Sequence, residues 1–393
     1  MLFRLPDSQE LTSNSDTSLF TKFQWSLPWL VRYPLNRTKT FLGRNAFAKK
    51  RIIITIADHF EPSWSPSGLL SVDDSRRALE KYAKLAAETG NSLIGEDGTK
   101  YRHTNFYPAE QYDVEILDVM ANMQADGLGE VEIHLHHGVE KPDNSENLRR
   151  SLIEFRDILA ERHKCLSRLD GKGIPRYAFV HGNLALANSC GGRFCGVDDE
   201  LEILQETGCY ADMTMPSAPD QSQVPMLNSI YECTGPLNRQ RAHDVGKPLE
   251  NYGRFPTLPL IFTGPLVLNW TRRIKGIPVP RLDDGALVAN QTMDLARFKR
   301  WESSNISVSG QPEWMFIKLY CHGFFVDDQA ASIGEDAKRF FSEVIEYGKK
   351  QGNFTVHFAS AREAVNMVFA AVDGKKGNPN DFRNYRLKSI MSE

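Results

Sequence analysis

Short apolar runs rich in β-branched residues alternate along most of this chain with segments whose apolar residues recur at helical spacing. Three of the runs are RIIITIAD (51–58), EVEIHLHH (130–137) and EWMFIKLYCHG (313–323). Between the runs, Ser71 with Asp74 and Ser360 with Glu363 have the spacing of capping boxes, so each pair predicts the start of a helix. Strands and helices that alternate at this density predict an α/β fold with a parallel sheet.

Six or seven such units predict a distorted (β/α)7-type barrel, closed or nearly closed. The alternation is lost from residue 218 to about residue 310, where proline, glycine and asparagine are frequent. We interpret this stretch as an inserted loop-rich and β region that faces the substrate. The barrel would then comprise residues 51–217 and 311–374, followed by a polar tail over 375–393.

Residues 1–50 form an arm that is basic and aromatic. Trp25 and Trp29 lie among lysines and arginines, and no acidic residue occurs from Leu19 to Ala57. Two interpretations are open: peripheral contact with an anionic membrane surface, or packing across the main domain with the aromatic side chains inward. Pro28 and Pro34 should break a long amphipathic helix, which favours packing.

Composition restricts the partners and the location. The net charge of −3 gives no general attraction to nucleic acid. No run approaches the roughly 20 apolar residues of a membrane span, and the first residues lack a secretory signal pattern. We therefore expect a cytoplasmic protein, located at the membrane surface if the arm binds lipid.

The six cysteines are expected to be reduced thiols. Cys190 and Cys195 flank a Gly-Gly-Arg-Phe segment and could bind a metal or close a loop. No second Cys/His pair has a zinc-ribbon spacing, which argues against a metal there.

Histidines gather at the carboxyl ends of the predicted strands, where barrel enzymes place their chemistry. They are His59, His134, His136, His137, His181 and His322. Four separate strands deliver these side chains to one rim. Imidazole is a common ligand of zinc and similar ions, so this convergence predicts a divalent metal site. Without a metal, the same imidazoles could act as acid and base.

Strand geometry separates the candidates further. Side chains alternate along a strand, so His134 and His136 share a face and His137 points away unless the strand has already ended. Asp58 and His59 are adjacent, and both face the pocket only if the strand ends or bulges there. Glu61 is expected to be solvated.

Five segments in this order resemble the NodB-homology polysaccharide deacetylases, over about residues 51–365. The segments are ITIADHFEP, HTNFYPAEQY, EVEIHLHHGVE, DDELEILQETGCYADMTMPS and MFIKLYCHG. The resemblance implies a distorted barrel of about seven strands. It also implies that Asp58 is the catalytic base, His59 and His136 are metal ligands, and His322 is the catalytic histidine.

Three positions depart from that family. Its second aspartate is His59 here, its second metal histidine falls on Glu140, and its Arg-Pro loop is replaced by His181-Gly182-Asn183. His134 could take the missing ligand's place, Glu140 could coordinate, or metal and activity could have been lost. The face that His134 shares with His136 favours the first.

The leading hypothesis is a hydrolase that removes acetyl groups from a sugar or polysaccharide with a divalent metal, expected to be zinc. The metal would bind His59, His134 and His136. Asp58 would be the base and His322 the acid, while His181 and Asn183 would orient the glycan. Two alternatives are a glycosidase that uses two carboxylates and a non-catalytic carbohydrate-binding protein of polysaccharide assembly.

Overall fold

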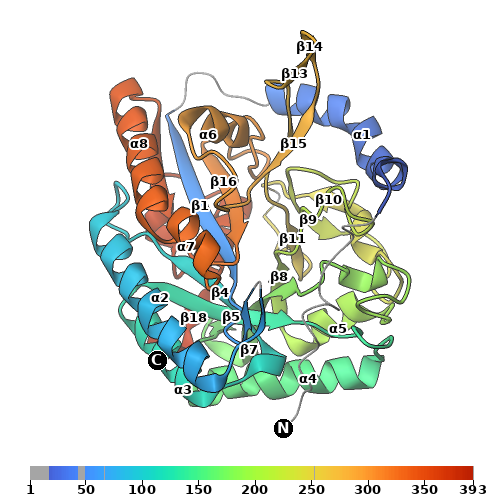
Figure 1. The fold of residues 1–393 in the computed structure, drawn as a ribbon, viewed down its shortest axis with the longest axis vertical. Helices are drawn as coiled ribbons and strands as arrows, with labels where there is room; N and C mark the ends of the chain where they lie inside the picture. Colours follow the sequence, from blue (N-terminus) through green and yellow to red (C-terminus); the bar gives the residue numbers. More distant parts are fainter. Residues whose placement is uncertain (1–16, 43–48, 66, 252, 393) are drawn as a thin grey trace.

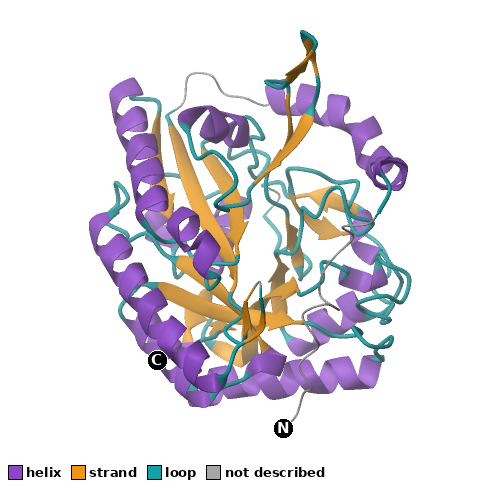
Figure 2. Ribbon diagram, viewed as in Figure 1, coloured by secondary structure: helices purple, strands orange, loops and turns teal. Residues whose placement is uncertain are grey.

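The computed structural model describes residues 17–42, 49–65, 67–251 and 253–392. It is a mixed α/β structure, in which strands occupy the centre and most helices lie on the outside (Figure 2). The helices are α1 (Leu19–Leu42), α2 (Val72–Ser92), α3 (Val114–Ala125), α4 (Ser145–Asp157), α5 (Glu200–Thr207), α6 (Leu295–Glu302), α7 (Val326–Ser332), α8 (Glu335–Gln351) and α9 (Ala361–Val372). The predicted class of fold is therefore confirmed.

One large, mostly parallel sheet forms the core (Figure 1). Its main strands are β1 (Lys50–His59), β4 (His103–Pro108), β5 (Gly129–Leu135), β7 (Lys172–His181), β8 (Cys209–Asp212), β9 (Ile230–Cys233), β10 (Gly246–Pro248), β11 (Leu260–Phe262), β16 (Trp314–Cys321) and β17 (Phe354–Phe358). They lie in the order β10-β9-β11-β8-β7-β5-β4-β1-β16, and β17 also pairs with β1. Strand β9 runs antiparallel to both of its neighbours, β10 and β11.

Strand β1 is at the centre of this arrangement. It pairs with β16 along most of its length, with β17 at its start and with β4 at its end. From Ile52 to His59 every residue is buried. A parallel strand that is covered on both faces reads as a continuous apolar run, which is why RIIITIA is so easily recognised in the sequence.

A closed barrel is not confirmed, because the backbone ladders between described strands leave the sheet open between β10 and β16. The buried side chain of Lys318 on β16 contacts the segment that follows β8, an interior strand of this order. Its Nζ donates hydrogen bonds to the carbonyls of Met213 and Met215, just beyond β8, at 2.6 and 2.7 Å. Burial lowers the pKa of Lys318 to about 7, although the charges of Asp212 and Asp284 oppose the shift.

The stretch from 218 to about 310 is only partly an insertion. Strands β9, β10 and β11 belong to the central sheet, and β11 is parallel to β8. The remainder includes helix α6 and two small antiparallel pairs: β12 (Leu266–Asn269) with β15 (Arg281–Asp284), and β13 (Arg273–Ile274) with β14 (Ile277–Pro278).

Both predicted capping boxes begin helices. The Ser71 hydroxyl accepts a hydrogen bond from the backbone N–H of Asp74 at the start of α2. At the start of α9, the Ser360 hydroxyl and the Glu363 carboxylate make the two reciprocal bonds of a full capping box. Each cap satisfies backbone donors that the first helical turn leaves open.

The N-terminal arm contains a long helix, so the prediction that its prolines would break such a helix is wrong. Helix α1 continues through Pro28 and Pro34. Its Trp29 side chain is 1% exposed and packs with Leu227 and Leu266. This tertiary contact supports one face of α1 against the domain, as the packing interpretation expected. Residues 1–16 and 43–48 of the predicted arm lie outside the described part.

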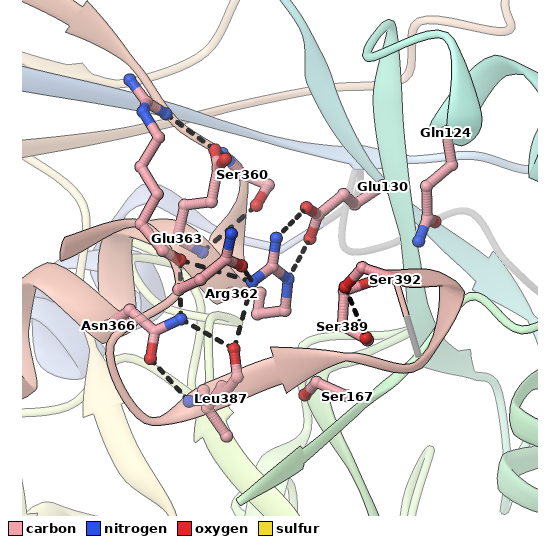
Figure 3. A network of polar contacts seen from close by, with 12 residues as sticks. Gln124, Glu130, Ser167, Ser360, Arg362, Glu363, Asn366, Leu387, Ser389 and Ser392 are labelled. Atoms are coloured by element: carbon pink, nitrogen blue, oxygen red, sulfur yellow. Dashed lines mark hydrogen bonds and ion pairs between the residues drawn. The ribbon is translucent and has the colours of Figure 1, made fainter. Parts of the chain in front are cut away.

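The C-terminal segment, predicted as a polar tail, is part of the fold. Its strand β18 (Leu387–Ser389) pairs with β6 (Ser167–Leu169). Asn366 on α9 binds both the N–H and the carbonyl of Leu387, at 2.7 and 2.9 Å (Figure 3). Arg362 donates two hydrogen bonds to Glu130 at 2.6 and 3.0 Å and one to the Leu387 carbonyl at 3.1 Å. These polar side chains hold the C-terminal segment against the fold through buried hydrogen bonds. The polar composition of the segment therefore did not indicate that it is exposed to solvent.

Replacing Arg362 with glutamine should destabilise the protein by about 3–5 kcal/mol, because the buried Glu130 carboxylate would lose its charge partner. The matched control is Arg386→Gln, which removes the more exposed pair with Asp170. That change should cost about 0–1 kcal/mol. Urea unfolding followed by circular dichroism measures both values, and equal losses for the two variants would contradict the role given to Arg362.

Candidate metal centre

The two polar side chains at the end of β1, Asp58 and His59, lie on opposite faces of the sheet. β1 remains extended through His59 without a bulge, so Asp58 and His59 alternate. Strand β16 is in register, with Asp58 opposite Cys321. His322 therefore lies on the face of His59, and the two rings are 4.9 Å apart between centroids.

His59, Glu61 and His134 form a buried group that can hold a metal ion. Their candidate ligand atoms lie within 4.8 Å of one another. The Oε1 atom of Glu61 is 3.4 Å from Nε2 of His134 and 3.4 Å from Nε2 of His136. The structure thus brings the three predicted ligands, His59, His134 and His136, around one carboxylate.

Outer partners orient His134, within β5, and His136, which follows that strand. Nδ1 of His134 lies 2.9 Å from the Val180 carbonyl, which can only accept, so this nitrogen carries the proton and Nε2 is free to bind a metal. Nδ1 of His136 lies 2.6 Å from the Glu110 carboxylate, which leaves its Nε2 directed at Glu61. Such carbonyl and carboxylate partners are typical of metal-binding histidines.

The electrostatics of the group suit a cation. Burial lowers the pKa of His59, and His322 and His134 lower it further, so its imidazole is neutral and able to ligate. Burial alone would raise the pKa of Glu61, but its close contacts with His134 and His136 outweigh burial and the pKa falls. Burial opposes protonation of His136, yet Glu110 and Glu61 raise its pKa to about 9, so a metal ion that binds its Nε2 must displace a proton.

A pocket of about 220 Å³ opens beside this group. His59, Asn183, Tyr320 and His322 contribute to its walls. Two residues with predicted roles in catalysis and substrate binding, His322 and Asn183, therefore share a cavity with the predicted ligand His59.

Asp58 is not part of this pocket. Its carboxylate accepts hydrogen bonds from the Tyr82 hydroxyl at 3.0 Å and from the Gly323 N–H at 2.7 Å, and it lies 2.8 Å from Nδ1 of His103. A Cβ atom on residue 323 would come within 2.3 Å of Asp58, so only glycine permits this approach. The bulge that would have turned Asp58 towards His59 is absent from β1.

Two further candidates also lie elsewhere. His181 is opposite Leu135 in the parallel ladder of β5 and β7, so it points to the other face from His134. There its ring is 4.8 Å from that of His137. Glu140 is exposed and lines a different pocket with Lys141 and Asn144, so His134 rather than Glu140 joins the metal group.

Two carboxylates of the site were not predicted. Glu61 was expected to be solvated, yet it is 5% exposed and lies between His134 and His136. Its position two residues after His59 was the available signal, because residues two apart share a face in extended chain. Glu110 belongs to a short 3-10 turn, Ala109–Gln111, and no pattern in the sequence marks it.

Comparisons with profiles of known protein families, with curated proteins and with solved structures find no match to this chain. The resemblance to NodB-homology deacetylases therefore stays a prediction that depends on its motifs. None of the helices in the described ranges is long and apolar enough to cross a membrane.

Glu110→Gln should weaken zinc binding at this group by about 10–100-fold, because it removes the charge that orients His136. Asp58→Asn should leave the affinity unchanged, since Asp58 faces away. Competition with a chromophoric chelator measures both. Loss of affinity in Asp58→Asn with none in Glu110→Gln would contradict the assignment of faces.

Proposed function

We propose that this chain is a metal-dependent hydrolase that removes acetyl groups from a sugar or polysaccharide. The observation that supports it is the group His59, Glu61 and His134 beside a pocket that also holds His322 and Asn183. His136, held by Glu110, completes the set of nitrogen donors around Glu61. When bound there, a divalent ion such as zinc supplies Lewis acidity for an acetyl carbonyl and for a water molecule.

His322 is the group for proton transfer in this proposal. Its ring lines the pocket, lies next to His59 and stacks on Phe325 with centroids 5.2 Å apart and an angle of 17°. Because Asp58 faces away from the pocket, we assign both proton transfers of the reaction to the His322 imidazole. It would accept a proton from the attacking water and donate a proton to the departing amine or alkoxide.

Asn183 is the residue for sugar recognition. It lines the same pocket, and its buried Oδ1 has no hydrogen-bond partner among the residues described. A buried acceptor without a partner carries a free-energy cost that a ligand can relieve. A sugar hydroxyl that donates to Oδ1 would do so.

The size of the pocket favours a small group over a long segment of glycan. Its volume of about 220 Å³ is below the roughly 300–1,000 Å³ of sites that enclose drug-sized ligands. An acetylated sugar unit that enters from one side is the substrate that we expect.

A glycosidase on the same fold has less support. That reaction needs two carboxylates on either side of the scissile bond. Among the described residues that line the pocket, Asp220 is the one carboxylic acid, and Asp58 lies on the other face. We therefore prefer deacetylation.

Zinc-loaded protein should release acetate from oligomers of N-acetylglucosamine or from an O-acetylated oligosaccharide, and chelation should stop the release. His322→Ala should lower kcat by about 10²–10⁴-fold, the usual contribution of a positioned acid or base. Asn183→Ala should mainly raise KM. An enzymatic acetate assay follows all three.

The matched control is Val326→Ser, an exposed position on α7 close in sequence to His322. Full turnover by chelated protein would contradict the proposal. Binding of the same oligomers without acetate release would instead identify a non-catalytic carbohydrate-binding protein.

A further inference from the structure

A second cluster of ligand side chains lies on the opposite face of β5 and β7 from the His59 group. His137 follows β5, His181 ends β7, Cys195 is in the glycine-rich loop 190–196 and Glu200 begins α5. We propose that these four side chains bind a zinc ion with a structural role. The inference does not depend on the proposed hydrolase activity.

The four side chains meet at one point. Their candidate ligand atoms lie within 4.8 Å of one another. Oε1 of Glu200 is 3.1 Å from Nε2 of His137, and Oε2 of Glu200 is 3.4 Å from Sγ of Cys195. Ligand atoms around tetrahedral zinc are about 3.3–3.8 Å apart, so small side-chain adjustments would complete the geometry.

His181 provides a second, independent observation that points to a bound ion. Its side chain is fully buried, and neither ring nitrogen has a hydrogen-bond partner among the described residues. Oε1 of Glu200 lies 3.7 Å from Nε2, beyond hydrogen-bond distance. A buried imidazole without partners is costly in a folded protein, and coordination of a cation at Nε2 would remove this cost.

His137 has the outer partner that a metal ligand needs. Its Nδ1 lies 3.1 Å from the Asp143 carboxylate, while its Nε2 faces Glu200. A carboxylate behind a histidine fixes the ring and strengthens it as a ligand. His137 also lines an open pocket of about 520 Å³, which provides a route for an ion to enter.

The chemistry of the donors favours zinc with a structural role. One thiolate, two imidazoles and one carboxylate form a mixed set that suits zinc better than magnesium or calcium. Four protein ligands leave no open position for a substrate or water, as in structural zinc sites.

The ion would fix one wall of the pocket beside the His59 group. Cys190, Arg193 and Phe194 of loop 190–196 line that pocket, and Cys195 ends the same loop. The loop is already joined to residues 138–143, because the Cys195 carbonyl accepts from the N–H of Asp143 at 2.7 Å. Zinc on Cys195 would tie the loop to β5, β7 and α5 at once.

Metal analysis of the full-length protein tests the site. After zinc loading and dialysis, we expect two zinc ions per chain, falling to one in Cys195→Ser and in His181→Ala. Cys190→Ser is the matched control, since this cysteine is in the same loop but outside the cluster, and it should keep two. Cobalt-loaded wild-type protein should show a thiolate-to-cobalt charge-transfer band.

The two metal sites can fail separately. His59→Ala should bind one ion and keep the thiolate band. Suppose that the wild-type chain binds one ion, shows no thiolate band and loses that ion in His59→Ala. This result would overturn the second site and leave the proposed catalytic one. One ion with the band would support the second site and contradict the proposed hydrolase centre. The wild-type spectrum decides the matter even if Cys195→Ser fails to fold.

Helix α1 carries a separate, exposed apolar surface. Opposite the face that packs through Trp29, it exposes a stripe whose members are Leu19, Phe20, Phe23, Leu27, Val31 and Leu35. The spacing of three and four residues places most of this stripe along one side of the helix. The described part of α1 contains no acidic residue.

A second exposed element stands next to α1. Strand β12 packs on α1, with the Leu268 N–H donating to the Tyr33 hydroxyl at 2.9 Å. It leads into the β13–β14 hairpin, which projects beyond the sheet beside α1 (Figure 1). The hairpin segment exposes Trp270, Ile274 and Ile277 together with Arg272, Arg273, Lys275 and Arg281. No acidic residue occurs from 263 to 282.

We infer that α1 and this hairpin together bind an anionic membrane surface. Apolar and aromatic side chains next to basic ones, without acids, match the headgroup region of such a bilayer in both polarity and charge. A second copy of the chain would bring two basic surfaces together, so charge favours lipid as the occupant.

Sedimentation with vesicles tests this surface. The full chain should bind phosphatidylcholine vesicles that contain phosphatidylglycerol, and lose binding in high salt or with phosphatidylcholine alone. Binding should weaken in a double variant that carries Phe23→Ser and Val31→Ser. It should also weaken in the single variant Ile277→Ser. Lys275→Gln should weaken it by about fivefold. Val72→Ser, an exposed site on α2, is the control. Equal binding by every variant, or a concentration-dependent dimer that Phe23→Ser abolishes, would overturn the inference.

Discussion

The alternation of side chains along the buried strand β1 determines where the candidate metal ligands of this protein lie. Parallel ladders hold β1 on both sides, and their register with β16 is continuous as far as Asp58 and Cys321. No local bulge can therefore turn two adjacent residues to one side. His59 and His322 are placed on the pocket face, while Asp58 and Cys321 are placed behind it with His103.

The same rule divides the histidine-rich segment at the end of β5. His134 and His136 approach Glu61, whereas His137 meets His181 on the other face. Two ligand groups are thus separated by one layer of strands and need not compete for the same ion. Each is supported by outer carboxylates, Glu110 on one side and Asp143 on the other.

Much of this could be predicted from the sequence, because periodic patterns report on strands, helices and caps directly. The α/β class, the capping boxes at Ser71 and Ser360, and the convergence of His59, His134 and His136 all depend on such patterns. Glu61 could have been predicted from its spacing to His59. Glu110 and Glu200 could not, since their roles depend on contacts between segments distant in the chain.

Other differences between the predictions and the structure also arise from contacts between segments that are distant in the chain. Tertiary packing of Trp29 supports α1 through two prolines, which local propensity alone would not allow. The polar C-terminal segment is fixed by Arg362 and Asn366, so its polarity served internal hydrogen bonds rather than solvent. Closure of the sheet could not be decided from strand count, because it depends on pairing between strands that are distant in the chain.

The central claim is that the face of β1 occupied by His59, and not the face of Asp58, holds the catalytic metal. Anomalous diffraction at the zinc edge from crystals of the zinc-loaded protein tests it most directly. We predict a peak about 2.0–2.2 Å from the nitrogen and oxygen ligands of His59, Glu61 and His134. A peak beside Asp58, His103 and Cys321, with none at His59, would contradict the account.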